Sequence, residues 1–334
     1  MSDEKFDSLV DELKQQKPDS ELLKTVGWGY DVKTVKGTKA QHKYGIVGSL
    51  NKIHDVNEIP STFEDELIIP AKLDGASCVA YYSNGKLVKA VSRGNGTTGI
   101  DCTQKYQKIV EKNKLNLFGF TGAVRGEIVF SNTDWENYLI KYPDAKFPRN
   151  TATGLFMRDD ATDDLEFVRF VAYKIHGSEE YKGSILYTGI LGMLSAWGFD
   201  VVPARGIRKN KIDDKALTEL FEEYAQIYPV DGLVLQNNIV IISTNGQFIY
   251  KDVAYKFKAE EKETTVIDVE WNLSKNNIMV PVVNIEPVEL SGATVRRASG
   301  FNAKYILNNK ITCGTRVKVC RANEVIPKIT EVLP

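Results

Sequence analysis

Apolar runs of five to ten residues recur along most of the chain, separated by clusters of Gly, Pro, Asn and Asp. Runs of this length that are rich in β-branched and aromatic residues predict strands. Before residue 260, strands are expected at Leu67–Leu73, Ser77–Tyr82, Lys86–Ser92, Ala123–Phe130, Leu165–Lys174, Val230–Gln236 and Phe248–Phe257. Asn84-Gly85 joins the second and third of these runs and predicts a hairpin.

Apolar residues at helical spacing predict a few helices among these strands. The expected helices cover residues 2–16, 133–142, 184–198 and 213–228. Thr133-x-x-Glu136 is expected to open the second helix as a capping box. Gly198 is expected to end the third helix, and Asp213 to cap the fourth.

The pattern changes after Glu260, where strands replace helices almost completely. The expected strands are Thr264–Trp271, Ile278–Ile285, Thr315–Arg321 and Val325–Val332. Several short strands with no long helix predict a small β-barrel of OB type. The whole chain is therefore expected to be an α+β domain followed by such a barrel.

Composition narrows the class of protein. The 334 residues suggest roughly two domains, and 43% hydrophobic with 26% charged residues is typical of a soluble globular protein. No apolar run approaches the ~18 residues of a membrane span, and the polar N-terminus is unlike a signal peptide. The four cysteines form no C-x-x-C pair and only three histidines are present, which argues against zinc in this chain and for a cytoplasmic setting.

Net charge is −1, but charge is unevenly distributed. Residues 290–334 hold eight Lys or Arg against two Glu. An excess of this kind fits an ordinary solvated surface, and it also fits a patch that faces nucleic-acid phosphates.

Lys72 is the first candidate for chemistry, because it closes the apolar run Leu67–Ala71 just before Asp74-Gly75. An amine flanked by an apolar strand is partly desolvated, which favours the neutral form whose lone pair is a nucleophile. Asp74 points to the same side if the strand continues. Taken alone, the four residues Lys72–Gly75 are more simply explained as a coincidence.

Four further motifs also have ordinary explanations when each is taken alone. A glycine-rich loop that follows Arg93 offers backbone N–H groups to a phosphate or ribose, but it also fits a hairpin end. Glu127 in Arg125-Gly126-Glu127 could hold a sugar hydroxyl or a cation, or form a surface salt bridge. Asp231-Gly232 opens an apolar strand, as a turn would. Lys256 lies in an apolar strand, where a snorkelling edge lysine is the plainer interpretation.

The order of the five motifs is more specific than any one of them. This order is that of the covalent nucleotidyltransferases, so the chain resembles DNA ligases, RNA ligases and mRNA capping enzymes, which form a lysyl-nucleotide intermediate. In detail it is similar to the NAD-dependent DNA ligases over almost its full length. The matching segments are Ser49-Leu50, Lys72–Gly75, Arg93–Asp101, Arg125–Glu127, Phe147–Arg158, Tyr173, Asp231–Val234, Ala254–Phe257, Pro281–Val283, Glu286–Val288 and Arg321–Pro327.

The resemblance implies a role for each matched residue. Lys72 would be the nucleophile that takes AMP from NAD, with Asp74 and Lys256 beside it. The implied nucleotide contacts are Ser49, Leu50, Arg93, Glu127, Tyr173 stacked on the adenine, and Val234. Mg²⁺ is implied at the carboxylates of Glu127 and Asp231. The implied contacts with the DNA backbone are Arg149, Arg158 and Arg321.

The family holds nicotinamide mononucleotide (NMN) through a Y-H element and a D-x-x-Y-D element. Asp3 to Asp7 fits the second element, with Phe6 in place of Tyr, and the Y-H element would lie upstream of Met1. We therefore expect a weaker hold on NMN, or one that another chain supplies.

Other positions depart from the family pattern. At three positions an acidic residue of the family is replaced: Pro70 and Ile100 each stand where the family has Glu, and Asn95 stands where it has Asp. Gln236 stands where the family has a lysine, and the segment around Ser274-Lys275-Asn276 stands where it has R-T-G. Lys251 or Lys258 is expected to compensate for Gln236.

The resemblance also implies the domain layout. We expect a remnant NMN-binding segment at 1–45, an adenylation domain at 46–260 and an OB-fold domain at 261–334. The chain resembles the adenylation-plus-OB subunit of ligases that some bacteriophages split in two. The expected partners are nicked double-stranded DNA and a second subunit with zinc-finger, helix–hairpin–helix and BRCT modules, in the cytoplasm of a host if the source is viral.

The predicted function is therefore that of an NAD-dependent DNA ligase, which carries AMP on Lys72 and seals a 5′-phosphate to a 3′-hydroxyl at a nick. Three alternatives stay open. One is an ATP-dependent ligase or capping-type enzyme with the same core. Another is a nicked-DNA-binding subunit with weakened catalysis, which Pro70 and Gln236 motivate. The last is a structural protein whose strand lysines are incidental.

Overall fold

The computed structural model describes residues 13, 17, 37–45, 47–158, 163–177, 181–257, 261–273, 279–290, 293–322 and 326–334. They belong to two compact units, Met1–Lys256 and Phe257–Pro334. Apart from Leu13, which is helical, the predicted helix over 2–16 lies outside the described residues, as do the candidates Asp3, Phe6 and Asp7.

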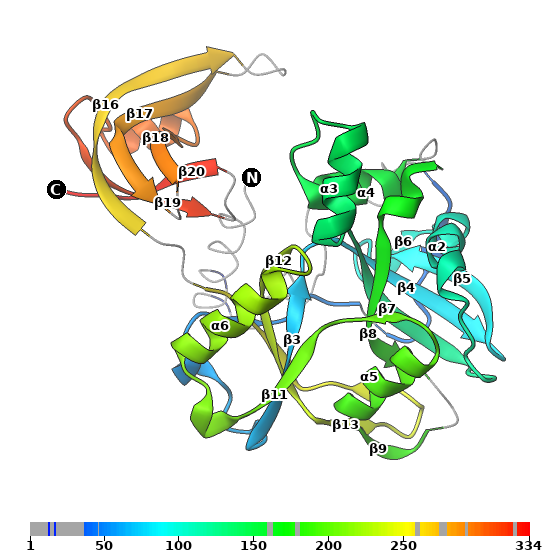
Figure 1. The fold of residues 1–334 in the computed structure, drawn as a ribbon. Helices are drawn as coiled ribbons and strands as arrows, with labels where there is room; N and C mark the ends of the chain where they lie inside the picture. The colour runs from blue at the N-terminus through cyan, green and yellow to red at the C-terminus, as the bar shows by residue number, and fades with distance from the viewer. Residues whose placement is uncertain are drawn as a thin grey trace. The chain divides into compact units, whose positions relative to one another are not determined.

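Two five-stranded sheets form the centre of the first unit (Figure 1). The first sheet has the order β10(Asp200–Val201), β8(Arg169–His176), β7(Gly122–Val129), β4(Ala76–Ser83) and β5(Lys86–Ser92). The second sheet has the order β11(Ala204–Arg208), β3(Glu66–Leu73), β12(Val230–Asn237), β15(Asp252–Tyr255) and β2(Lys52–Ile53). Smaller sheets pair β1(Lys39–Gln41) with β6(Thr98–Ile100), and β14(Phe248–Ile249) with β13(Ile239–Ile242) and β9(Gly183–Leu186).

Helices cover these sheets because each helix presents one apolar face. Helices α2(Thr103–Val110), α4(Pro148–Met157) and α5(Tyr187–Ala196) pack on the first sheet, and α6(Asp214–Ala225) packs on β12. Helix α3(Asn132–Lys141) packs through Tyr138 against Phe130 and Phe167. Short 3₁₀ turns complete the unit at Val56–Glu58, Glu111–Asn113, Asp163–Phe167 and Lys209–Lys211.

The hairpin between β4 and β5 shows how local sequence sets the register. Asn84 and Gly85 both adopt positive φ, +49° and +73°, as a type I′ turn requires. Strand β4 then pairs with β5 on one side and with β7 on the other. The predicted hairpin is therefore confirmed.

The second unit is a closed barrel in the order β16(Glu261–Leu273), β17(Met279–Leu290), β18(Ala293–Ser299), β20(Ile326–Val332) and β19(Arg316–Ala322). One short helix, α7(Ala303–Asn308), lies between β18 and β19. Buried Val266, Val283, Val317 and Ile329 fill the interior. The closed barrel confirms the small β-barrel expected after Glu260, and it has one strand more than the four that were predicted.

Several predicted elements were wrong in extent. Residues 184–198 begin as β9 and become helical only at Tyr187, and Leu165 lies in a 3₁₀ turn before β8 begins at Arg169. The predicted strand at 248–257 is two strands, β14 and β15. Helix α3 is capped by Ser131, whose Oγ accepts from the Asp134 N–H, rather than by Thr133. Helices α2 and α4 and strands β11, β13 and β18 are among the elements that were not predicted.

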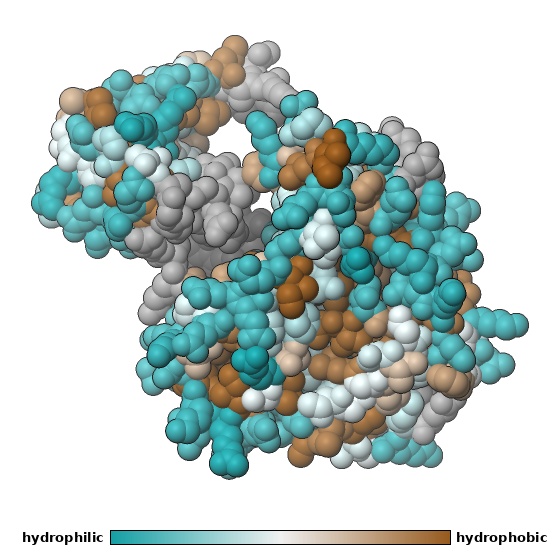
Figure 2. All heavy atoms as spheres, in the orientation of Figure 1, coloured by the Kyte–Doolittle hydropathy of each residue, from teal (hydrophilic) through white to brown (hydrophobic). Residues whose placement is uncertain are grey.

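Hydrophilic side chains cover much of the visible face, with apolar side chains in separate patches between them (Figure 2). Exposed apolar residues include Ile140 on α3 and Ile239 on β13. Among the helices that the structure describes, none is both long enough and apolar enough to cross a membrane.

Candidate active site

Lys72, Asp231 and Lys256 meet on three neighbouring strands of the second sheet. Lys72 lies near the end of β3, Asp231 near the start of β12, and Lys256 directly after β15. The Lys72 ammonium donates to both Asp231 carboxylate oxygens, at 2.7 and 2.9 Å. The Lys256 Nζ lies 2.6 Å from Asp231 Oδ2. One carboxylate is therefore shared by two ammonium groups.

A bulge in β12 gives this arrangement its geometry. The register with β3 shifts between Val230 and Leu233, which re-aims the residues between them. Gly232 lies there with φ +155°, and a Cβ at this position would come within 2.4 Å of the Tyr255 carbonyl oxygen. The second residue of Asp231-Gly232 is therefore required for the close approach of β12 to β15.

Partial burial sets the charges of this cluster. The side chains of Lys72, Asp231 and Lys256 keep 25%, 15% and 18% of their exposure. Burial would raise the pKa of Asp231, but the two ammonium groups hold it below its usual value. Burial, and then repulsion from Lys72, lowers the pKa of Lys256. The site thus holds an ionised carboxylate and destabilises the charged form of Lys256.

Asp74 does not join this cluster directly. Its carboxylate pairs with the Arg149 guanidinium, 3.1 Å away, in the first turn of α4. Burial raises the pKa of Asp74, and Arg149 opposes that rise. Sequence analysis assigned these residues to catalysis and to DNA respectively, and the structure brings them together.

Glu127 and Tyr173 form a second polar group on the first sheet, where β7 pairs with β8. The Tyr173 hydroxyl donates to Glu127 Oε2 at 3.2 Å and lies 3.4 Å from Ser77 Oγ. Burial raises the pKa of Glu127 to about 7, although Arg125, Lys72 and Arg93 oppose the rise. Burial also raises the pKa of Tyr173 to about 12. The influence of Lys72 on Glu127 links the two sheets electrostatically.

The glycine-rich loop after Arg93 is stabilised by Asn95. Its Oδ1 accepts from the Thr97 N–H at 3.1 Å and from the Thr98 N–H at 2.9 Å. Asparagine offers the same acceptor oxygen as the aspartate of the family pattern. The departure at this position therefore leaves the turn chemistry unchanged.

The remaining predicted nucleotide contacts lie around these groups. Ser49 is exposed and Leu50 half-buried, directly after Gly48, whose carbonyl accepts from Arg125 Nη2 at 3.2 Å. Val234 is half-buried on β12, opposite Ala254.

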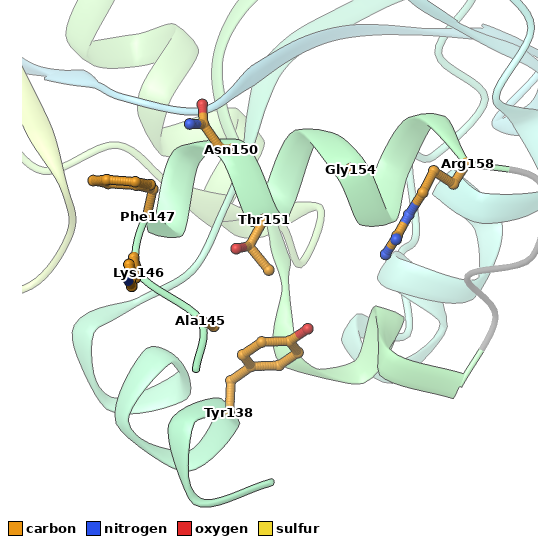
Figure 3. Close-up of a pocket in the computed structure, with 8 residues that line it drawn as sticks. All are labelled: Tyr138, Ala145, Lys146, Phe147, Asn150, Thr151, Gly154 and Arg158. Carbon is orange, nitrogen blue, oxygen red and sulfur yellow. The ribbon is translucent and has the colours of Figure 1, made fainter. Parts of the chain in front are cut away.

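Two predicted DNA contacts fall in different parts of the chain. Arg158 follows α4 and lines a pocket between α3 and α4 with Tyr138, Lys146 and Thr151 (Figure 3). Arg321 lies in β19 of the barrel, and its side chain is outside the described residues.

Gln236, where the family has a lysine, is 1% exposed in β12. Its Nε2 donates to the Asn237 carbonyl at 2.8 Å, and within the described residues its Oε1 has no hydrogen-bond partner. Its cross-strand partner Asp252 pairs with the buried ammonium of Lys174, from the other sheet. This ion pair was not predicted, although Lys174, like Lys72, is a lysine in an apolar strand.

Metal ligands are sparse in the part of the chain that the structure describes, where no three His, Cys, Asp or Glu side chains cluster. Both Asp231 oxygens already accept from lysines, so Asp231 fits the role of a counter-ion better than that of a metal ligand. Mg²⁺ commonly binds through one or two carboxylates together with substrate phosphates. Glu127 is the carboxylate that fits this mode.

Protein-family models and related proteins both match this chain, and they agree on the kind of protein. Residues 49–260 match the model of the NAD-dependent DNA ligase adenylation domain, and residues 263–334 match that of the NAD-dependent DNA ligase OB-fold domain. A DNA ligase of Lachnoclostridium phytofermentans is 31% identical over 354 residues, which cover 100% of this chain and 53% of that protein. A DNA ligase of Acanthamoeba polyphaga mimivirus is 30% identical over 351 residues, 100% of this chain and 51% of that protein. The chain spans about half the length of these relatives.

Proposed function

The chain belongs to the NAD-dependent DNA ligase family, and on that premise we propose that it carries AMP on Lys72 and passes it to the 5′-phosphate of a DNA nick. The observation that supports this most is the Lys72–Asp231–Lys256 cluster, because it holds the nucleophile at a fixed position with a charged partner. Fixed geometry of this kind lowers the entropic cost of reaction.

In the first step, Lys72 Nζ attacks the adenylyl phosphorus of NAD. The Lys72 ammonium first loses one proton to solvent, so that the neutral amine has a lone pair. A P–N bond then forms, the bond to the NMN phosphate breaks, NMN leaves, and the nitrogen releases a second proton to solvent. Asp231 orients the amine before attack, since it binds the ammonium through both oxygens. Lys256, 2.6 Å from the same carboxylate, is placed to approach phosphate oxygens as negative charge develops there.

Glu127, Arg93 and Tyr173 are proposed to hold the nucleoside. Glu127 is ionised once the pH exceeds its pKa of about 7, and Tyr173 then donates to it. Ser49, Leu50 and Val234 are proposed to complete this surface. Mg²⁺, when bound by Glu127 and phosphate oxygens, would offset phosphate charge.

DNA is proposed to be the second substrate. Arg149 and Arg158 lie at the two ends of α4, and Lys146 lines the same pocket as Arg158. Guanidinium and ammonium groups of this kind bind backbone phosphates and confer salt dependence on binding. The 3′-hydroxyl would then displace AMP and close the nick.

The test is the mass of the protein after incubation with NAD and Mg²⁺. The chain is expected to gain one AMP, attached to Lys72, and Lys72→Ala is expected to gain none. Lys215→Ala, which removes a lysine that is 84% exposed, is the control. An adduct that forms from ATP and not from NAD would favour the ATP-dependent alternative, and a folded chain that forms none would favour a DNA-binding subunit.

The expected second subunit and the cytoplasmic location stay proposals. Mixing this chain with a protein that carries zinc-finger and helix–hairpin–helix modules, and measuring nick sealing with and without it, tests the first of these.

A further inference from the structure

The glycine-rich loop after Arg93 is fixed in part by its own Asn95 side chain. Gly94 and Gly96 adopt φ of +56° and +88°, which only glycine reaches easily, so further contacts from outside the loop help to select one conformation. The segment before the catalytic strands supplies them. Strand β1 pairs with β6, and the backbone N–H groups of His42 and Val47 donate to loop carbonyls at 2.8 Å each.

The His42 side chain reaches the start of this loop. Its Nε2 lies 3.2 Å from the Ser92 carbonyl oxygen and 3.2 Å from that of Arg93. Its Nδ1 lies 2.8 Å from the Tyr81 hydroxyl. The two carbonyls can only accept, so Nε2 must carry the proton. Nδ1 then accepts from Tyr81, whose oxygen accepts from the Lys43 N–H at 3.2 Å.

The surroundings favour a neutral ring. The Lys89 ammonium lies over the Tyr81 ring, 4.9 Å from its centroid, and the charge of Arg125 also acts on His42. Burial, followed by these two cations, lowers the pKa of His42, although the two carbonyls oppose the shift. Burial raises the pKa of Tyr81 to about 12, so its hydroxyl remains a donor at neutral pH.

We infer that His42 is a positioning residue: its neutral imidazole, held by Tyr81, fixes the backbone at Ser92-Arg93 so that Arg93 is presented to the bound nucleotide. This inference rests on the proposed function. Arg93 is exposed, and its charge is near enough to Glu127 to oppose the rise in the pKa of that carboxyl. His42 binds the backbone carbonyl of this same residue. His42 itself touches no reacting atom.

The test measures lysyl-AMP formation by the full chain at a series of NAD concentrations. His42→Ala is expected to raise the NAD concentration that gives half the maximal rate, here the KM, about tenfold, which corresponds to about 1.4 kcal/mol. The maximal rate of this single turnover is expected to change less. His42→Gln, whose amide can donate to the same carbonyls, is expected to stay within about threefold of the wild type. Lys43→Ala, which leaves the backbone donor in place, is the matched control.

A double-mutant cycle separates positioning from general loss of structure. If His42 acts through Arg93, the KM of His42→Ala/Arg93→Ala should equal that of Arg93→Ala alone. Additive effects, or an unchanged KM in His42→Ala with only a lower Tm, would overturn the inference. A wild-type chain that forms no adduct would instead overturn the proposed function.

Nitrogen NMR of the histidine ring provides a test that needs no variant. At pH 7 the His42 signals should be those of a neutral ring protonated at Nε2. A protonated ring, or a proton on Nδ1, would overturn the inference whatever the kinetics.

Discussion

Replacing Asp231 with asparagine removes the carboxylate that two lysines share and leaves the shape almost unchanged. The Lys72 and Lys256 ammonium groups lie 2.6 to 2.9 Å from its oxygens, so Asp231→Asn leaves two positive charges side by side without a counter-ion. We expect the first unit to lose stability for this reason.

The size of the loss follows from exposure. Breaking a fully buried ion pair costs about 3–5 kcal/mol, and an exposed pair contributes about 0–1 kcal/mol. These side chains keep 15–25% of their exposure, and two contacts are lost together. We therefore expect Asp231→Asn to lower the free energy of unfolding by about 2–3 kcal/mol at pH 7.

The loss should depend on pH. The pKa of Lys256 is already below its ordinary value, and removing the carboxylate lowers it further. A lysine whose folded-state pKa is depressed binds its proton more weakly in the folded state, so stability rises as the pH rises toward about 10.5. The difference between Asp231→Asn and the wild type should therefore shrink between pH 7 and pH 9.5.

Urea denaturation of the wild type and of Asp231→Asn at pH 7 and at pH 9.5 measures the difference in the free energy of unfolding between them. Asp231→Asn/Lys256→Met is the matched control, and it should be more stable than Asp231→Asn because only one ammonium remains. A loss below about 0.5 kcal/mol at pH 7, or an equal loss at both pH values, would refute the electrostatic reasoning.

Three further predictions concern other parts of the first unit. Glu127→Gln should raise the free energy of unfolding by about 2 kcal/mol at pH 8, because burial makes the ionised form of Glu127 costly above its pKa of about 7. Thermal melts should show that this gain shrinks as the pH falls toward 4.5, where Glu127 is neutral in the folded chain. Lys174→Met and Asp252→Asn should each lower the free energy of unfolding by about 3 kcal/mol in urea denaturation, because each leaves a buried charge unpaired. Lys174→Met/Asp252→Asn should cost less than the sum of the two, and additive costs would contradict the ion pair. Gly94→Ala should lower the free energy of unfolding by about 2 kcal/mol or more, because φ is +56° and the new Cβ would lie 1.9 Å from the Thr98 carbonyl oxygen. Gly192→Ala in α5 is the control: beyond the backbone of its own helix, its new Cβ would have no described atom within 4 Å, so the same melts should show unchanged or higher stability.

Local sequence determined the strands and turns where one physical signal dominated. Strand β5 matches its predicted limits, and the Asn84-Gly85 turn has the two positive φ values that such a pair favours. Asp213 caps α6 through its side chain, as expected. These features depend on neighbours within a few residues, so their information lies in the chain itself.

Predictions failed where local signals were mixed. Helix α4 was not predicted because polar and small residues interrupt its apolar positions, so that only Ala152, Leu155 and Phe156 are buried. Residues 183–186 have no apolar periodicity of their own, yet they are a strand because β13 pairs with them. Tertiary pairing overrides weak local preference in such segments.

The order of the motifs along the sequence predicted the candidate site residues, but it did not predict which of them form ion pairs or hydrogen bonds with one another. Lys72 and Asp231 are 159 residues apart, and Lys174 and Asp252 are 78 apart. His42 meets the Arg93 carbonyl across 51 residues. Spacing along one strand fixes which face a side chain occupies, whereas contacts between strands depend on sheet order, register and the bulge at Gly232. Only the folded chain brings these groups within bonding distance, because burial of both sheet faces selects that order and register.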